Sequence, residues 1–241
     1  MKTIALIPAR YAATRFPAKL MQPLGGKSII RRTYENTVST LLFDEVIVVT
    51  DSDIIFNEIV QNGGYAIMSK HSHGRGSDRI AEAVAVIDVY IVINVEGDEP
   101  FVKKELLENL LGAFKNDLHH KVEVASLMYR VVNEEIIENP NHVKVVVDMD
   151  NNALFFSRSV IPFHRDKNIT PVYYKHIGIY AYRKNILMNF TKWDTTPLEK
   201  LEKLEQLRYL ENGIKIKMVL TDESPISIDT PQDYELAKKL I

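Results

Sequence analysis

The sequence predicts an α/β protein built on a Rossmann-like, doubly wound and mostly parallel sheet. Short β-branched and aliphatic runs alternate with amphipathic stretches through the first half of the chain, which is the pattern of repeated βαβ units. Two of these runs, Glu45–Thr50 and Tyr90–Val95, are apolar almost without interruption, as parallel strands covered on both faces are. Polar motifs follow the runs, and open α/β sheets bind ligands at the carboxyl ends of their strands.

The first half of the chain supplies four strands, each followed by a helix. Ser77 is a suitable N-cap for the third helix, and the Gly63–Gly64 pair can end the second. The strands are expected at Lys2–Pro8, Glu45–Thr50, Tyr65–Met68 and Tyr90–Val95, and the helices at Ser28–Ser39, Ile54–Val60, Ser77–Ile87 and Lys103–Phe114.

The second half of the chain changes to a strand-rich order. Asn151–Asn152 is a turn signal that predicts a hairpin, and Thr230–Asp233 resembles a capping box that opens a final helix. We expect one domain over residues 1–241, with about residues 122–186 as an inserted β-rich lobe. The expected strands are Val122–Val132, Val143–Val147, Ala153–Ser157, His176–Tyr182 and Lys215–Leu220, and one helix is expected at Pro197–Asn212.

Composition limits the classes of function. Lys and Arg total 30 against 32 Asp and Glu, so no overall charge attracts nucleic acid or an anionic membrane. The chain has no cysteine, which excludes disulfides, thiol catalysis and Cys-ligated zinc. The apolar run at the start is too short for a signal peptide or a membrane span, so a soluble cytoplasmic protein is the expectation.

A basic loop follows the first predicted strand. It carries Arg10, Arg15 and Lys19 and contains no glycine, so neither the dinucleotide fingerprint of an NAD-dependent oxidoreductase nor a P-loop fits. The planar guanidinium groups of arginine and the compact ammonium of lysine are suited to binding a polyphosphate. The alternative is a solvated basic loop.

A carboxylate-rich segment follows the strand at Tyr90–Val95. Glu96, Asp98 and Glu99 stand at its carboxyl end, where oxygen ligands could hold Mg²⁺; the alternative is a polar turn that ends the strand. Asp229 precedes a helix and could be a capping group. Asp229 is a candidate site residue only through a pairing with Asp98.

The other polar candidates are weaker taken singly. The loop His71–Arg79 holds glycines and arginines before a helix, and is either a nucleotide-contact loop or a surface loop. Ordinary core or surface roles also suit four further residues, His176, Tyr180, Glu205 and Gln206.

Taken together, these segments resemble the 3-deoxy-manno-octulosonate cytidylyltransferase family over essentially the whole chain. The resemblance implies CMP transfer from CTP to the octulosonate (KDO) with release of pyrophosphate, Mg²⁺ as cofactor, a role in lipopolysaccharide assembly, and a nucleotide-diphospho-sugar transferase fold. It also implies a homodimer formed through the β-rich lobe. The matching segments are IPARYAATRFPAKL, NVEGDEP, HVKVVVD, ALFFSRSVIPF, KHIGIYAYRK, LEKLEQLRYLENG and SIDTPQDYE, in family order.

The resemblance also implies residue roles. Catalysis falls to Arg10, Lys19, Asp98 and Asp229, with Asp98 and Asp229 as the Mg²⁺ ligands. Nucleotide binding falls to Ala9, Arg10, Lys19, Arg75, Gly76, Ser77, Arg79 and Asp98, and sugar binding to Arg15, Glu96, His176, Tyr180, Glu205 and Gln206.

Two positions depart from the family pattern. Glu96 stands where glutamine is usual, and ionised glutamate only accepts hydrogen bonds, so an amine on the sugar would suit it. Arg75 replaces a small hydroxyl residue. Two alternatives therefore stay open: a cytidylyltransferase for a related acidic sugar (8-amino-KDO or sialic acid), and a non-catalytic nucleotide-binding protein.

Overall fold

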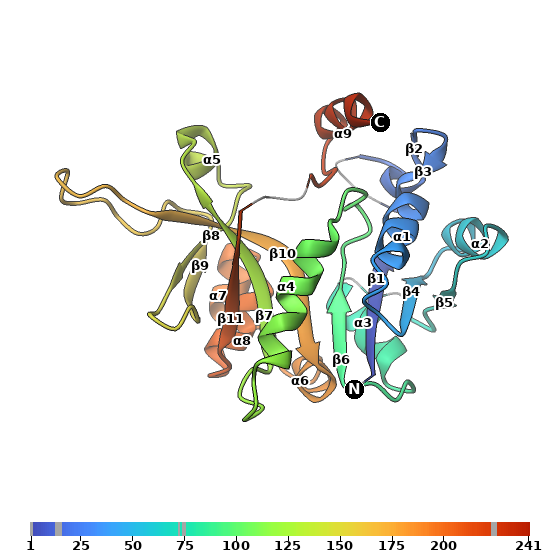
Figure 1. Cartoon of the computed structure of the whole chain (residues 1–241), viewed down its shortest axis with the longest axis horizontal. Coiled ribbons are helices and arrows are strands. Elements are labelled where there is room, and N and C mark those ends of the chain that lie inside the picture. Colours follow the sequence, from blue (N-terminus) through green and yellow to red (C-terminus); the bar gives the residue numbers. More distant parts are fainter. Residues whose placement is uncertain (1, 13–15, 72, 74–75, 223–225) are drawn as a thin grey trace. The chain divides into compact units, whose positions relative to one another are not determined.

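The computed structural model describes residues 2–12, 16–71, 73, 76–222 and 226–241 (Figure 1). The chain forms two compact units. Unit 1 comprises Met1–Glu108, Arg183–Thr191 and Pro225–Ile241, and unit 2 comprises Asn109–Tyr182 and Lys192–Ser224. The predicted lobe at about residues 122–186 overlaps unit 2, which also takes in residues 192–224.

Unit 1 contains four parallel strands in the order β6-β1-β4-β5, which confirms the predicted α/β class with a mostly parallel sheet. Helix α4 (Lys104–Lys115) runs across the boundary between the units. The strands are β1 (Thr3–Ala9), β4 (Glu45–Thr50), β5 (Ala66–Met68) and β6 (Ile91–Asn94), with β2 (Pro23–Leu24) and β3 (Lys27–Ser28) as a separate pair; the helices are α1 (Ile29–Ser39), α2 (Asp53–Gln61), α3 (Gly76–Val84), α6 (Lys184–Phe190), α9 (Pro231–Ala237) and the 3-10 helices η1 (Lys19–Met21) and η2 (Lys238–Leu240).

The apolar strands form the core of unit 1. Residues 4–7 of β1 and residues 91–93 of β6 are completely buried, because neighbouring strands and helices cover both faces of these strands. The Ser28 hydroxyl accepts a hydrogen bond from the backbone N–H of Arg31 at 3.2 Å and so caps α1. Strong apolar runs and caps of this kind explain why the sequence predicts these elements.

Strand order predicts a ligand site in unit 1. The chain passes from β1 to β4 and β5 on one side, and then returns to β6 on the other side of β1. This reversal makes the carboxyl ends of β1 and β6 a topological switch point, where open α/β sheets bind ligands. Residues 10–19 follow β1, and Glu96 and Asp98 follow β6.

Ser77 is not the N-cap of α3, contrary to expectation, because the helix already begins at Gly76. A Cβ at position 76 would lie 3.3 Å from Pro8 Cγ, so the glycine allows the first turn to pack closely on β1. The helix also ends earlier than predicted, at Val84.

Unit 2 is built on the strand order β11-β7-β10, in which β7 pairs in parallel with β11 and antiparallel with β10. The predicted hairpin between β8 and β9 is confirmed, and Asn151 has a φ of 56°, a conformation that asparagine tolerates in turns. The elements are β7 (Val124–Val131), β8 (Lys144–Val147), β9 (Ala153–Ser157), β10 (Tyr173–Arg183, ending at the unit boundary), β11 (Ile216–Thr221), α5 (Glu134–Glu138), α7 (Pro197–Glu202) and α8 (Gln206–Glu211).

The single helix predicted at Pro197–Asn212 is wrong. The segment forms two helices, α7 and α8, with Lys203 in the left-handed conformation at φ 56°. The break allows a buried ion pair between Glu199 of α7 and Arg208 of α8. Leucines at every third position drift around an α-helix, so they do not provide one apolar stripe that would favour a continuous helix.

No helix in the part of the chain that the structure describes has both the length and the apolar character needed to cross a membrane.

Candidate active site

Three predicted residues of unit 1 meet at one point. Lys19, the first residue of η1, directs its ammonium at two carboxylates: it is hydrogen-bonded to Asp98, and its Nζ lies 3.3 Å from Asp229 Oδ1. The side chains of Lys19 and Asp98 are largely buried, whereas that of Asp229 is 44% exposed. Residues far apart in the sequence therefore form one cation–carboxylate cluster.

The cluster keeps Lys19 charged. Burial disfavours the ammonium, but the charges and hydrogen bonds of Asp98 and then Asp229 outweigh it, so the pKa of Lys19 is raised above its ordinary value. Lys19 is thus a permanent cation at neutral pH. A cation beside the switch point suits an anionic ligand.

Backbone contacts hold the two carboxylate-bearing segments together. The N–H of Ile228 donates to the carbonyl of Asp98 at 3.0 Å, and the Thr33 hydroxyl donates to the carbonyl of Gly97 at 2.9 Å. A Cβ at Gly97 would lie 3.2 Å from Leu20 Cδ1, Ile30 Cδ1 and the Pro8 carbonyl oxygen. Gly97 therefore allows the chain to pack closely at this point.

Asp229 is not the cap of α9. The capping box is formed by Thr230 and Asp233, and the Thr230 hydroxyl accepts from the Asp233 N–H at 3.2 Å. The Asp233 carboxylate also accepts from the backbone N–H of Asp229 at 3.1 Å. The side chain of Asp229 thus faces Lys19 while its own backbone is fixed by the helix start.

The carboxylate pair fits a divalent cation. Asp98 and Asp229 already converge on one positive charge, the Lys19 ammonium. Within the described residues, no group of three or more His, Cys, Asp or Glu side chains could hold a metal by itself. An ion here would complete its coordination with water and phosphate oxygens, as Mg²⁺ commonly does.

A cleft of about 550 Å³ opens in unit 1 beside the ends of β1 and β4. Its volume is in the range of small-molecule sites. Arg10, which is exposed, supplies a cation to it. The lining residues are Arg10, Tyr11, Ala12, Asp51, Ser52, Asp53, Ile54, His73 and Arg79.

Arg79 joins the walls of this cleft. Its side chain is only 3% exposed, and its guanidinium donates to the carbonyl of Ala9, to Asp51 Oδ2 at 2.7 Å and to the carbonyl of His73 at 3.4 Å. Asp51 was not predicted, although it directly follows the apolar strand β4. The nucleotide contacts of Ala9, Gly76, Ser77 and Arg79 stay predictions.

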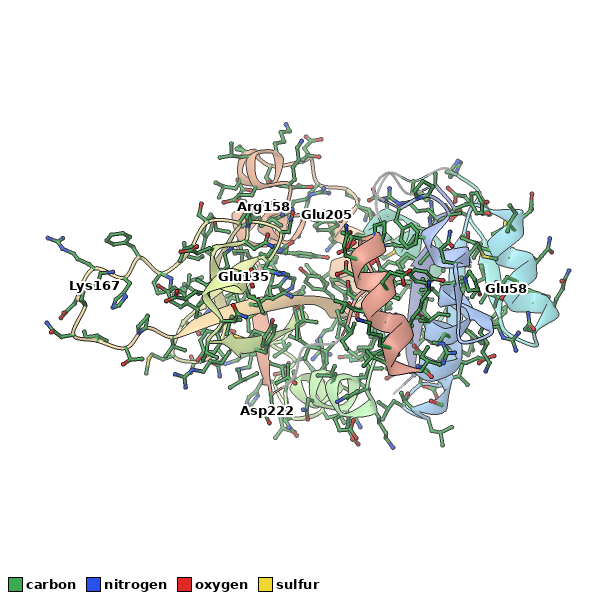
Figure 2. All side chains as sticks on the ribbon, turned by 90° about the horizontal axis from the view of Figure 1, so that it is seen from above. Glu58, Glu135, Arg158, Lys167, Glu205 and Asp222 are labelled. Atoms are coloured by element: carbon green, nitrogen blue, oxygen red, sulfur yellow. The ribbon has the colours of Figure 1, made fainter. Side chains whose placement is uncertain are left out.

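The predicted sugar-binding residues of unit 2 are linked by aromatic contacts. The rings of His176 and Tyr180 lie 5.3 Å apart, and Tyr180 stacks on Tyr182 at 5.7 Å. Tyr182 in turn stacks at 6.0 Å on Tyr209 of α8, the helix that begins beside Glu205 and Gln206. Figure 2 labels Glu205 on the helical part of unit 2.

Glu96 has a hydrogen bond to its own strand. The Asn94 amide Nδ2 donates to Glu96 Oε1 at 2.8 Å, which fixes one carboxylate oxygen at the end of β6. Two other predicted residues, Arg15 and Arg75, lie outside the described residues.

Comparison with known proteins shows the family to which the chain belongs. Residues 4–216 match the cytidylyltransferase family. The chain is 61% identical to the 3-deoxy-manno-octulosonate cytidylyltransferase of Flavobacterium johnsoniae (100% of this chain, 99% of the relative) and 53% identical to that of Christiangramia forsetii (100% and 97%).

Solved structures agree with this assignment. A CMP:2-keto-3-deoxy-manno-octonic acid synthetase complexed with CTP has a TM-score of 0.94 at 35% identity, covering 100% of this chain and 98% of the other. A 4-diphosphocytidyl-2C-methyl-D-erythritol synthase from Anaerococcus prevotii (TM-score 0.66, 18% identity, coverage 99% and 98%) shares the fold. The family match and the fold shared with these structures place the chain in the nucleotidyltransferase class. Within it, the chain belongs to the 3-deoxy-manno-octulosonate cytidylyltransferase family.

Proposed function

We propose that the chain transfers CMP from CTP to 3-deoxy-D-manno-octulosonate, giving CMP-KDO and pyrophosphate. The observation that carries this proposal is the cluster in which Lys19 faces both Asp98 and Asp229. Relatives of 61% and 53% identity bear the octulosonate cytidylyltransferase name, and a structural neighbour over the full length was solved with CTP.

The chemistry requires charge neutralisation more than a covalent intermediate. The anomeric oxygen of the sugar attacks the α-phosphorus, the bond from that phosphorus to the bridging oxygen breaks, and pyrophosphate leaves while the hydroxyl proton passes to water. Arg10 and Lys19 offset the negative charge on the departing phosphates. Mg²⁺, bound through Asp98 and Asp229, would add Lewis-acid polarisation of the phosphoryl oxygens.

An activated sugar nucleotide is a donor for a glycosyltransferase. The resemblance to the octulosonate cytidylyltransferases implies that this donor feeds lipopolysaccharide assembly. CTP and the octulosonate are charged, water-soluble metabolites, so the cytoplasm is the proposed location, without a nucleic-acid or membrane partner.

Pyrophosphate release tests the function. The protein is incubated with Mg²⁺, each of the four nucleoside triphosphates, and either octulosonate or sialic acid. We expect release only with CTP and octulosonate. Release with CTP and sialic acid alone would move the assignment to a sialic acid cytidylyltransferase, and CTP binding without release would support a non-catalytic nucleotide-binding protein.

Glu96 favours a second candidate substrate, the 8-amino analogue of the octulosonate. An ammonium on the sugar pairs better with a carboxylate than with an amide. In a competition assay, Glu96→Gln should shift the kcat/KM ratio toward the ordinary sugar by about tenfold, or ~1.4 kcal/mol. Glu105→Gln, an exposed charge-matched change on α4, should leave the ratio unchanged. If the wild type uses the ordinary sugar equally well or better, the amino-sugar candidate is wrong.

A homodimer formed through the β-rich lobe at about residues 122–186, which overlaps unit 2, is the proposed assembly. The loop that carries Lys167 projects from the strands of this unit (Figure 2). Phe163 and Ile169 on the same loop are 85% and 62% exposed, so this loop offers two large apolar side chains for contact with a second copy of the chain. Light scattering should give twice the 27.6 kDa mass of one chain. Phe163→Asp should give monomers, whereas the equally exposed Val86→Asp in unit 1 should not; a wild-type monomer in dilute solution would refute the dimer.

A further inference from the structure

An irregularity in unit 2 places a serine opposite unpaired backbone. In the antiparallel pair of β7 and β10, Ile177 lies opposite Leu127, but the next partner, Ser126, faces Tyr180. Gly178 and Ile179 therefore have no counterpart on β7, which is the geometry of a bulge. Bulges of this kind commonly re-aim side chains next to functional sites.

The hydroxyl of Ser126 fills this bulge. Ser126 is completely buried. Its Oγ lies 3.1 Å from the carbonyl oxygen of Ile177, 2.9 Å from that of Ile179 and 2.9 Å from Nε2 of His176. A hydroxyl has one proton to donate, and carbonyl oxygens can only accept.

Counting donors selects one tautomer of His176. If Ser126 donated to Nε2, both carbonyl oxygens would face lone pairs of Oγ without a proton between them. If Ser126 donates to one carbonyl and accepts a hydrogen bond from Nε2–H, only one carbonyl oxygen still faces a lone pair of Oγ without a proton between them. The second arrangement is lower in energy, so Nε2 carries the proton and Nδ1 is the acceptor of the ring.

The surroundings keep this ring uncharged. The rings of Phe156 and Tyr180 lie 5.1 and 5.3 Å from that of His176. Burial, helped by the neighbouring charge of Lys175, lowers the pKa of His176 to about 3. Among the described residues, no group forms a hydrogen bond with Nδ1 of His176. Nδ1 is also absent from the polar side-chain atoms of these residues that are both unpaired and fully enclosed, so it is not fully enclosed.

We propose that Ser126 is a positioning residue that holds His176 as the Nε2–H tautomer, so that Nδ1 accepts a hydrogen bond from a hydroxyl of the acidic sugar. The identity of the ligand rests on the proposed function. The tautomer assignment depends only on the geometry of the bulge.

Two variants and two readouts test the proposal. Ser126→Ala removes the hydroxyl, and Ser126→Thr is the matched variant that keeps it. The protonation of each His176 nitrogen is followed by ¹⁵N NMR of the full-length protein without ligand, with His176→Gln used to assign the signals. Steady-state kinetics give KM for octulosonate and for CTP separately.

We expect protonated Nε2 and bare Nδ1 in the wild type and in Ser126→Thr, and a mixture of tautomers in Ser126→Ala. KM for octulosonate should rise about tenfold in Ser126→Ala, the size of one lost hydrogen bond. KM for CTP should change by less than about twofold, because a structural role alone would not separate the two substrates.

The proposal is overturned if the wild type carries its proton on Nδ1, or if Ser126→Ala keeps both the tautomer and the KM for octulosonate. Should Ser126→Ala fail to fold, the wild type and Ser126→Thr spectra still decide the tautomer. A wild type that turns over no octulosonate would refute the proposed function, while the NMR result would still decide the role of Ser126.

Discussion

Replacing Asp98 by asparagine is expected to lower kcat for pyrophosphate release by at least about a hundredfold at saturating CTP. Asp98 is one of two carboxylates that converge on a single cation position, and its side chain is largely buried. Asparagine keeps the shape but removes the negative charge. The remaining carboxylate, Asp229, is 44% exposed and would hold a divalent ion more weakly.

The dependence of rate on Mg²⁺ concentration distinguishes a metal ligand from a residue with a purely structural role. A metal ligand should raise the Mg²⁺ concentration needed for half-maximal rate, whereas a purely structural residue should lower the amount of folded enzyme without changing that concentration. Asp88→Asn, an exposed change after α3, is the charge-matched control and should behave as wild type. Activity of Asp98→Asn within about fivefold of wild type at ordinary Mg²⁺ concentrations would contradict the assignment.

Replacing Arg208 by methionine is expected to lower the free energy of unfolding by about 3–5 kcal/mol. Arg208 and Glu199 form a two-pronged ion pair, with Arg208 Nε at 2.7 Å from Glu199 Oε2 and a terminal nitrogen at 2.6 Å from Oε1. The side chains are 2% and 4% exposed. Removing the guanidinium leaves a buried carboxylate without its counter-charge, and the pair also joins α7 to α8. Denaturant unfolding followed by circular dichroism measures the loss.

A double replacement distinguishes two causes of the lost stability, the unpaired buried carboxylate and the loss of side-chain packing. Glu199→Met combined with Arg208→Met should recover much of the stability, because two apolar side chains of similar length need no counter-charge. Lys200→Met, on the exposed face of α7, should change the free energy of unfolding by less than about 0.5 kcal/mol. A loss below about 1 kcal/mol in Arg208→Met would show that the pair is not needed for stability.

Local patterns were sufficient for most elements of the fold. The apolar runs that became β1, β4 and β6 are buried on both faces, so their sequences carry a strong signal. The capping box at Thr230 also formed where it was predicted. The helix predicted at residues 197–212 is wrong because the chain breaks at Lys203, and the contact that then joins the two shorter helices, the ion pair between Glu199 and Arg208, has no local signature in the sequence.

The sequence predicted which residues belong to the candidate site, and the structure showed which of them contact one another. The resemblance already paired Asp229 with Asp98, and the 3.3 Å approach of Asp229 to Lys19, 210 residues away, adds that both carboxylates face one ammonium. The linking role of Arg79 and the presence of Asp51 in the cleft could not be inferred, because both depend on side chains that meet across strands.

The amino-acid sequence by itself determined the α/β class, the family and the set of polar residues at the strand ends, since these follow from hydrophobic periodicity and from motifs carried by contiguous residues. The tertiary structure alone decided that Lys19 lies between Asp98 and Asp229, that α7 and α8 are separate, and that Ser126 faces the bulge beside His176. Such contacts join residues distant in the chain, and their geometry is set by packing of whole elements, which no local pattern encodes.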